Sequence, residues 1–230
     1  MPEFTNTPQE WIDAIRNLQP ANRPYDPQDA DDEKIPATPA WIRARNRQYA
    51  LDNIPPRYAD ASLDREDVWL WLLGALIDPK QAPSLLITGI TGTGKTHLAY
   101  AALRLAGESG YRSLPWVATS TAALYGDLRP SAKRDSEAVF GKVLAAPLLL
   151  LDDLGAAKTT EWTEEITYRL IDHRYNHCLP SIFTSNARKG ELTERLGDRT
   201  GSRLTEMCQK LVLEGTDRRR AAAPGLAAAA

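Results

Sequence analysis

The apolar positions of the chain fall into short dense runs, separated by longer segments of helical periodicity. A short apolar run without polar alternation is typical of a strand that is buried on both faces. Such runs lie at residues 84–88, 114–118, 148–151, 180–185 and 210–213. Helices are expected at residues 65–77, 95–108, 120–127, 135–144 and 161–178, with two short helices within 191–208. This alternation predicts an α/β fold in which a parallel sheet is flanked by helices.

The N-terminal part of the chain has a different pattern. Residues 8–18 have the spacing of a short amphipathic helix, with an apolar face made of Trp11, Ile12, Ile15 and Leu18. A helix of this length is marginal in water by itself, so we expect this face to dock on the body or on a partner protein. Residues 20–39 are rich in Pro and Asp and are expected to form a linker. From Ala40 a further helix is expected, with a basic face that is either solvated or in contact with phosphates.

These patterns predict three regions. Residues 1–52 form a short helical N-terminal extension with its linker, and residues 53–220 form one folded domain. Residues 221–230 form a disordered alanine-rich tail. The chain has 230 residues, 43% of them hydrophobic, which suffices for one sizeable core.

Composition then excludes several classes of protein. The formal net charge is −2, so any contact with nucleic acid has to come from local patches. The two cysteines, Cys178 and Cys208, form no Cys-x-x-Cys pair, which argues against a disulfide scaffold or a zinc ribbon. No stretch approaches the roughly 20 apolar residues that cross a bilayer, and no signal peptide pattern opens the chain. We therefore expect a cytoplasmic protein with no membrane contact.

Residues 89–96 read Gly-Ile-Thr-Gly-Thr-Gly-Lys-Thr, directly after an expected strand and at the start of an expected helix. This is the context that a P-loop requires. Its glycines let backbone N–H groups surround an anion, and the helix N-terminus adds partial positive charge. Lys95 can reach the β- and γ-phosphates of ATP, and the Thr96 hydroxyl can ligate Mg²⁺. The residues expected to bind ATP or ADP are Gly89, Ile90, Thr91, Gly92, Thr93, Gly94, Lys95, Thr96 and His97.

Polar residues follow two further strands. The run 148–151 ends in Asp152 and Asp153. Ligands of parallel sheets bind at the carboxyl ends of strands, so Asp152 is expected to hold Mg²⁺ and Asp153 to polarise the attacking water. Asn186 follows the strand at 180–185, and it reaches the γ-phosphate or its water if the two strands are neighbours. Taken alone, an Asn after a strand is commonly a turn residue.

With these motifs the chain resembles the AAA+ ATPases, and among them the DnaC/IstB-type group of helicase loaders and transposition ATPases. The resemblance covers roughly residues 50–220. Besides the P-loop it rests on residues 54–63 (Ile-Pro-Pro-Arg-Tyr-Ala-Asp-Ala-Ser-Leu), 148–155, 184–186 and 196–204. It implies an AAA+ core. Because the sequence ends soon after the last expected strand, we expect no separate C-terminal lid domain.

The resemblance also implies arginines that act on ATP. In such ATPases the segment that matches residues 198–204 carries an arginine finger, which acts on ATP held by the neighbouring subunit. The matching residue is Arg203, with Arg199 one helical turn before it; the alternative is a surface arginine paired with a nearby glutamate. A finger implies self-association through the ATP interface. A C-terminal nucleotide-sensing arginine is best matched by Arg219, and its competitors are Arg218 and Arg220.

Two features set this chain apart from many AAA+ proteins. Asp153 stands where most of them have Glu, so its shorter side chain leaves the water less well held. Residues 120–144 resemble the extra helical element of the initiator and loader clade, which contacts DNA. The candidate phosphate contacts there are Arg129, Lys133 and Arg134, and a solvated helical pair is an equally good interpretation of each.

A metal site built on histidine is disfavoured. His173 and His177 are four residues apart on an expected helix. They lack the Glu of a His-Glu-x-x-His site, and no third ligand is evident.

Three functions compete. The leading hypothesis is an ATPase that loads a replicative hexameric helicase onto single-stranded DNA, with the Trp11 helix as its helicase contact. Its hydrolysis of ATP to ADP and phosphate is expected to be slow and dependent on oligomers. The second is an IstB-type transposition ATPase that binds duplex DNA and regulates a transposase, against which the acidic linker argues mildly. The third, a P-loop kinase for a small molecule, is disfavoured by the two aspartates and Asn186.

Overall fold

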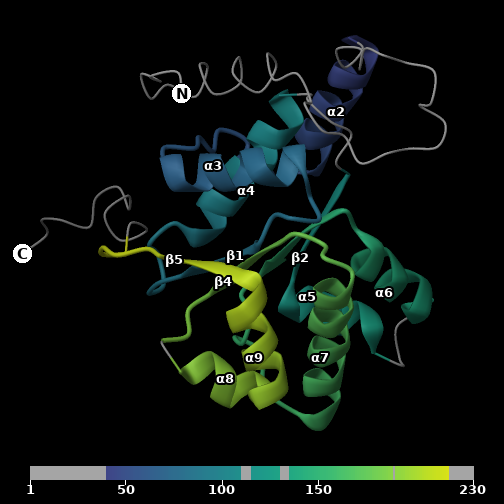
Figure 1. Ribbon diagram of the computed structural model, residues 1–230, viewed down its shortest axis with the longest axis vertical. Helices are drawn as coiled ribbons and strands as arrows, with labels where there is room; N and C mark the ends of the chain where they lie inside the picture. The colour runs from purple at the N-terminus through teal and green to yellow at the C-terminus, as the bar shows by residue number, and fades with distance from the viewer. Residues whose placement is uncertain (1–39, 110–114, 130–134, 189, 218–230) are drawn as a thin grey trace, which may run out of the picture.

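The computed structural model describes residues 40–109, 115–129, 135–188 and 190–217 (Figure 1). Its centre is a five-stranded sheet with the order β2-β3-β4-β1-β5, in which all neighbouring strands are parallel. The strands are β1 (Ser84–Thr88), β2 (Trp116–Ser120), β3 (Leu148–Asp152), β4 (Ser181–Ser185) and β5 (Cys208–Val212). The α/β fold that the sequence predicts, a parallel sheet flanked by helices, is confirmed.

Helices form a layer on each side of the sheet (Figure 1). One layer holds α2 (Ala40–Asn53), the 3₁₀ helix η2 (Pro56–Tyr58), α3 (Glu66–Ile77) and α4 (Lys95–Ser109). The other holds α5 (Thr121–Leu128), α6 (Ser136–Ala145), α7 (Glu161–Asn176), α8 (Glu191–Leu196) and α9 (Asp198–Met207). In the described ranges no helix combines the length and the apolar character that crossing a membrane requires.

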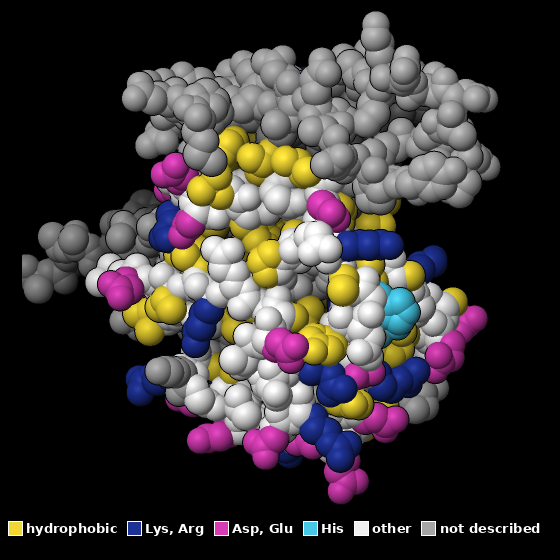
Figure 2. Space-filling model, in the orientation of Figure 1, with side chains coloured by type: hydrophobic (Ala, Val, Ile, Leu, Met, Phe, Trp, Pro, Cys, Tyr) yellow, Lys and Arg dark blue, Asp and Glu magenta, His cyan; other side chains and the backbone are white. Residues whose placement is uncertain are grey.

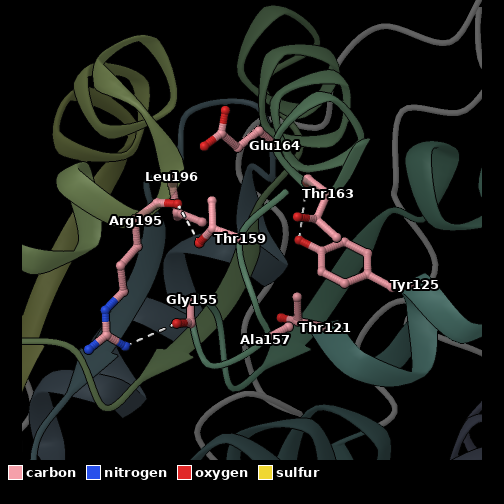
Figure 3. Close-up of a pocket in the computed structure, with 9 residues that line it drawn as sticks. All are labelled: Thr121, Tyr125, Gly155, Ala157, Thr159, Thr163, Glu164, Arg195 and Leu196. Carbon is pink, nitrogen blue, oxygen red and sulfur yellow. Dashed lines mark hydrogen bonds between the residues drawn. The ribbon is translucent and has the colours of Figure 1, made fainter. Parts of the chain in front are cut away.

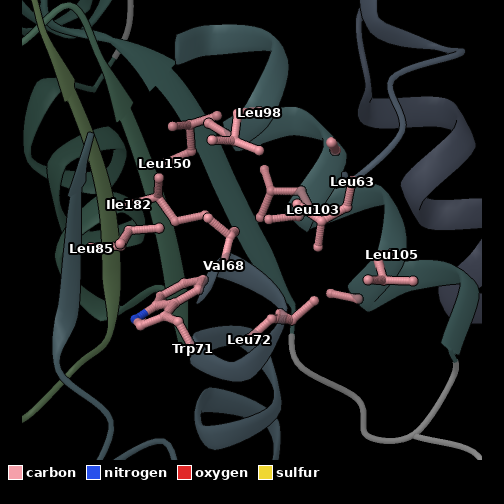
Figure 4. Close-up of a cluster of buried hydrophobic side chains, with 14 of the residues drawn as sticks. Leu63, Val68, Trp71, Leu72, Leu85, Leu98, Leu103, Leu105, Leu150 and Ile182 are labelled. Atoms are coloured by element: carbon pink, nitrogen blue, oxygen red, sulfur yellow. The ribbon is translucent and has the colours of Figure 1, made fainter. Parts of the chain in front are cut away.

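The central strands supply side chains to two separate cores. In β3, Leu148 and Leu150 join the core under α3 and α4, while Leu149 and Leu151 join the core under α5 and α7. Successive side chains of a strand point to opposite faces, so a strand covered on both sides has to be apolar throughout. Figure 4 shows the first core, where Val68 of α3 lies beside the strand residues.

The edge strands depart from the expected pattern. In β5 Leu211 is buried whereas Gln209, Lys210 and Val212 are exposed, so this strand is not apolar on both faces as predicted. An edge position explains the difference, because among the described strands β5 pairs with β1 alone and has less cover. The opposite edge strand, β2, begins at Trp116 rather than at residue 114.

Helix α2 belongs to the packed body. Ala50 is 1% exposed within the core that α2 shares with α4. The Tyr49 hydroxyl donates to the Trp116 carbonyl oxygen at 2.7 Å, and the two rings meet edge to face at 5.3 Å. Helix α2 therefore packs with the folded domain, although it lies before residue 53, where the sequence-based boundary places the start of that domain. A single buried alanine in a helix with many polar residues gives little pattern from which to predict this packing.

Arg174 joins three elements behind the sheet. It is fully buried on α7, and its guanidinium donates to the carbonyl oxygens of Leu144 and Ala146 at 3.1 and 2.9 Å. It also donates to the Pro180 carbonyl oxygen at 2.8 Å and to the Ser181 hydroxyl. Burial lowers its pKa to about 9. Arg174 thus satisfies the last carbonyls of α6, which have no partner inside that helix, and ties them to the start of β4.

Candidate nucleotide-binding site

The P-loop connects the end of β1 to the start of α4. Its backbone takes positive φ at Gly92 (84°) and Gly94 (97°), a region that residues with a Cβ rarely adopt. A Cβ on Gly92 would overlap the carboxylate of Asp217. The loop therefore needs glycine at positions 92 and 94 because of their positive φ, and at position 92 also because a side chain would overlap Asp217.

Lys95 lies inside this loop. Its side chain is 5% exposed, and its ammonium donates to the carbonyl oxygens of Gly89 and Ile90 at 2.9 and 2.8 Å. The Thr93 hydroxyl donates to the same Ile90 oxygen at 2.9 Å. The ammonium is thus held where the loop would receive phosphates. Its place at the first residue of α4 adds the partial positive charge of that helix terminus.

Polar side chains from three elements meet at the carboxyl edge of the sheet. The Thr96 hydroxyl donates to the Asp152 carboxylate at 2.9 Å, and the Thr184 hydroxyl donates to it at 2.6 Å. The Asn186 amide donates to the Asp153 carboxylate at 3.3 Å. We call these five residues the strand-end cluster. Because β3 and β4 are neighbours, the condition under which Asn186 was expected to join the site is met.

Burial raises the pKa of Asp152 above its ordinary value. Hydrogen bonds from Thr184 and Thr96 and the charge of Lys95 oppose this rise, and the charge of Asp153 adds to it. A buried carboxylate that is costly to ionise gains from a bound cation. Together with the Thr96 hydroxyl it offers hard oxygen ligands, and Mg²⁺ is held in proteins by few such groups and by substrate phosphates. The residues present therefore fit Mg²⁺ with a nucleotide.

Asp153 has a strained backbone that Thr184 supports. Its φ is 57°, uncommon for a residue with a side chain, and its N–H donates to the Thr184 hydroxyl at 2.9 Å. Thr184 therefore holds both aspartates, one through its donor and one through its acceptor. No role was predicted for Thr184 from the sequence. The available signal was a threonine at the penultimate position of a strand that is otherwise apolar in its interior.

The backbone from Asp152 to Gly155, the acidic loop, is held by hydrogen bonds from two sides. The Thr121 hydroxyl of α5 donates to the Asp152 carbonyl oxygen at 3.2 Å. From α8, Arg195 donates to the Gly155 carbonyl oxygen at 3.0 Å, and Thr159 donates to the Arg195 carbonyl oxygen at 3.2 Å. Figure 3 shows these side chains around a small cavity between α5, α7 and α8. The bracing fixes the acidic loop against the elements that flank it.

The segment after β5 returns across the P-loop. The Leu213 N–H donates to the Thr88 carbonyl oxygen at 2.7 Å, and a Cβ on Gly89 would lie 2.4 Å from the Leu213 carbonyl oxygen. This brings the chain up to Asp217 against the nucleotide loop. Arg219 follows two residues later and lies outside the described residues.

The remaining predicted residues are not part of this cluster or lie outside the described ranges. Arg203 is on α9 and pairs with Asp172 of α7, not with a glutamate. Arg129 is exposed at the end of α5. His97 is exposed on the first turn of α4. In the face shown in Figure 2, acidic and basic side chains intermingle over the lower half, where α7 to α9 lie. Outside the described ranges lie Trp11, Ile12, Ile15, Leu18, Lys133, Arg134 and the tail 221–230.

Comparison with known proteins agrees with this geometry. The family described as IstB-like ATP binding protein matches residues 63–222. The replicative helicase loader DnaI of Bacillus subtilis is 27% identical over 149 residues, which are 59% of this chain and 47% of DnaI. The match therefore spans about half the length of that relative.

Solved structures show the same fold. The crystal structure of the DnaC helicase loader has a TM-score of 0.60 at 26% identity, covering 70% of this chain and 100% of that one. A crystal structure of DnaI has a TM-score of 0.59 at 23% identity, covering 72% of this chain and 94% of that one. The sequence motifs, the parallel sheet and the family match thus agree. The chain belongs to the IstB-like ATP-binding proteins, the IstB/DnaC-type branch of the AAA+ ATPases.

Proposed function

We propose that this protein is an ATPase that loads a replicative hexameric helicase onto single-stranded DNA. The observation that carries the ATPase part is the strand-end cluster. There the Asp152 carboxylate accepts a hydrogen bond from Thr96 in the first turn of α4, and the Asp153 carboxylate accepts one from Asn186. A phosphate loop, a metal carboxylate and a second acid with an amide partner are the parts that phosphoryl transfer to water requires.

Each residue of the site then has a role. The P-loop N–H groups and Lys95 bind and orient the phosphates, and Mg²⁺ held by Thr96 and Asp152 supplies neutralisation of their charge. Asp153 accepts a proton from the attacking water, and Asn186 orients the Asp153 carboxylate. Thr184 positions the two acids relative to each other. Its hydroxyl donates a hydrogen bond to the Asp152 carboxylate and accepts one from the backbone N–H of Asp153. Arg203 reaches the ATP of a neighbouring subunit, so turnover requires assembly.

The loader part rests on the relatives. The similarity to DnaI, named a replicative helicase loader, and to the DnaC helicase loader supports a helicase as the partner. The helicase contact is proposed at Trp11, Ile12, Ile15 and Leu18, and the contact with single-stranded DNA at Arg129, Lys133 and Arg134. Residues 20–39 serve as the tether between the helicase contact and the ATPase body.

The test is native mass spectrometry of the full chain mixed with the replicative helicase of its own source, with Mg²⁺ and either ATP or ADP. We expect a defined complex that is lost in a variant lacking residues 1–39. A matched variant, Trp11→Ala with Ile15→Ala, is expected to weaken the complex while ATP turnover stays unchanged. A mixture that shows only the separate proteins in both nucleotides contradicts the loader function.

A transposition ATPase is the second candidate, because the family match carries the IstB name. In that case the protein assembles on duplex DNA with ATP. Gel-shift titration with duplex and single-stranded DNA of equal length distinguishes the two. Tight ATP-dependent assembly on duplex DNA, together with no helicase complex, replaces the loader by the transposition ATPase. Preference for single-stranded DNA supports the loader.

A further inference from the structure

Arg203 is held by one face of the neighbouring helix. Its Nη2 lies 2.6 Å from the Asp172 carboxylate of α7. Its Cζ lies 4.9 Å from the ring centroid of Tyr168 and 5.8 Å from that of Tyr175. Positions 168, 172 and 175 share one face of α7, because side chains three and four apart on a helix are neighbours. We call Tyr168, Asp172 and Tyr175 the arginine cradle.

The cradle is joined to α9 at a second point. The Tyr175 hydroxyl donates to the Glu206 carboxylate at 2.6 Å, and Glu206 lies three residues after Arg203 on the same helix. Behind these contacts Ile171 and Leu204 are buried in the core that α7 and α9 share. Packing thus fixes the spacing of the two helices, and with it the position of the cradle relative to α9.

The guanidinium is held but not buried as a whole. The side chain of Arg203 is 26% exposed and that of Asp172 is 31% exposed. Its Nε is buried and donates no hydrogen bond within the described residues. Arg199, one turn earlier, is exposed and has no ion pair or ring contact with any described residue. Of the two arginines in this segment, the structure therefore holds one and leaves the other in solvent.

An arginine that acts on a neighbour's ATP benefits from such support. Its side chain is long, and a group that is already oriented needs no reorganisation as charge develops in the transition state. Aromatic faces fix the plane of a guanidinium and leave its charge intact. One carboxylate fixes the rotation within that plane. The guanidinium has five N–H donors, so the contact with Asp172 leaves others for a phosphate.

We propose that Asp172 is a positioning residue for Arg203: together with the rings of Tyr168 and Tyr175 it orients the guanidinium that acts on ATP in the neighbouring subunit. This inference rests on the proposed arginine-finger role of Arg203. It predicts that loss of the Asp172 charge lowers turnover at the neighbour's site, and that ATP binding by that neighbour is unaffected.

Mixed oligomers test this with the full chain. The acceptor subunit carries Arg203→Ala, which keeps ATP binding and lacks the finger. The donor subunit carries Lys95→Ala, which lacks ATP binding and keeps the finger. Mixing the two is expected to restore turnover, with each donor acting on an acceptor's ATP. Donors that also carry Asp172→Asn are expected to restore about 10- to 100-fold less kcat, because a small misplacement of a catalytic group costs about that much.

Three comparisons make the result specific. The acceptor's KM for ATP is expected to stay unchanged, since the donor's Asp172 does not touch the bound nucleotide. Donors with Asp172→Glu, which keep the charge on a longer side chain, are expected to restore part of the lost kcat. Donors with Glu165→Gln, which remove an exposed carboxylate from the same helix, are expected to match the unmodified donor. Thermal melting of each donor identifies a variant that fails to fold.

The outcomes separate the two claims. If unmodified donors fail to restore turnover, Arg203 is not a finger, and both the proposed role and this inference fall. If unmodified donors succeed and folded Asp172→Asn donors match or exceed them, Arg203 acts on the neighbour without help from Asp172. That result overturns the inference and leaves the proposed function standing.

Discussion

The strand-end cluster and the arginine cradle are two polar sites built in different ways. The strand-end cluster gathers Thr96, Asp152 and Thr184 from three elements, because neighbouring parallel strands end at one edge. The arginine cradle uses the middle turns of α7, and its contacts depend on how α7 and α9 are rotated against each other. The first places an acid where burial raises its pKa, and the second pairs an acid with a cation. The sheet topology, with the helix that follows the P-loop, therefore positions the first site, whereas packing between helices positions the second.

The most direct test of this comparison is to remove Arg203, the cation that the arginine cradle holds. Arg203→Ala is expected to lower turnover by about 10³- to 10⁵-fold, the range of arginine fingers. ATP affinity is expected to stay the same, because the strand-end cluster of each subunit is intact. Steady-state phosphate release at saturating protein, with nucleotide binding measured by calorimetry, checks both. A variant that turns over ATP at the wild-type rate shows that Arg203 is not a finger.

Removing the second acid of the strand-end cluster has the next largest effect. Asp153→Asn is expected to lower single-turnover hydrolysis by about 10²- to 10⁴-fold, the contribution of a general base. ATP and Mg²⁺ binding are expected to persist, since Asp152 still bonds Thr96 and Thr184. The matched variant Asp152→Asn is expected to lose Mg²⁺-dependent binding instead. Equal effects of the two changes on Mg²⁺ binding would contradict the division of roles.

A second arginine, Arg174, sharpens the comparison because it stabilises the fold and lies in neither site. Arg174→Met is expected to lower the free energy of unfolding by at least about 3 kcal/mol, because it leaves several buried carbonyl oxygens without donors. Urea denaturation measures this. The control is Arg169→Met on the exposed side of α7, where the pair with Glu137 spans 4.0 Å and is expected to contribute less than about 1 kcal/mol. A loss at Arg174 no larger than at Arg169 would refute the bracing role.

The smallest effect is the pH dependence of the strand-end cluster. Mg²⁺ binds ionised Asp152, so its affinity is expected to fall about tenfold per pH unit once the pH is below the raised pKa of Asp152. Without Mg²⁺, the free energy of unfolding is expected to change with pH in the opposite direction to the Mg²⁺ affinity. The folded state holds a proton that the unfolded state has released, so unfolding becomes easier as pH rises from the ordinary aspartate pKa through the raised one.

Calorimetric Mg²⁺ titrations and urea unfolding over the same pH series measure both slopes. Asp152→Asn is the control, and it is expected to remove the contribution of this carboxyl to each. A Mg²⁺ affinity that does not change as the pH falls would show that Asp152 does not hold the metal.

Much of the fold could be predicted from the sequence, because the patterns that indicate strands and helices lie in consecutive residues. The run 148–151 is apolar throughout since β3 is covered on both faces, and that run also delivers Asp152 to the carboxyl edge. Thr184 was missed because a buried threonine in a strand looks like packing until its neighbour is known. The packing of α2 on the body was not predicted for a related reason, since α2 carries many polar residues and contacts elements that are distant in the sequence, as Tyr49 does at Trp116.

The sequence by itself determined the P-loop, the acidic strand end and the succession of strands and helices along the chain. These follow from backbone freedom at glycine, from burial on two faces and from charge placed after a strand, all of which are written in consecutive residues. The tertiary structure decided which distant side chains meet. Thr184 reaches both aspartates because β4 lies beside β3, and Asp172 meets Arg203 because α9 packs on α7. Such contacts depend on the order of the strands within the sheet and on the rotation of each helix about its axis. The packing of the whole domain sets both.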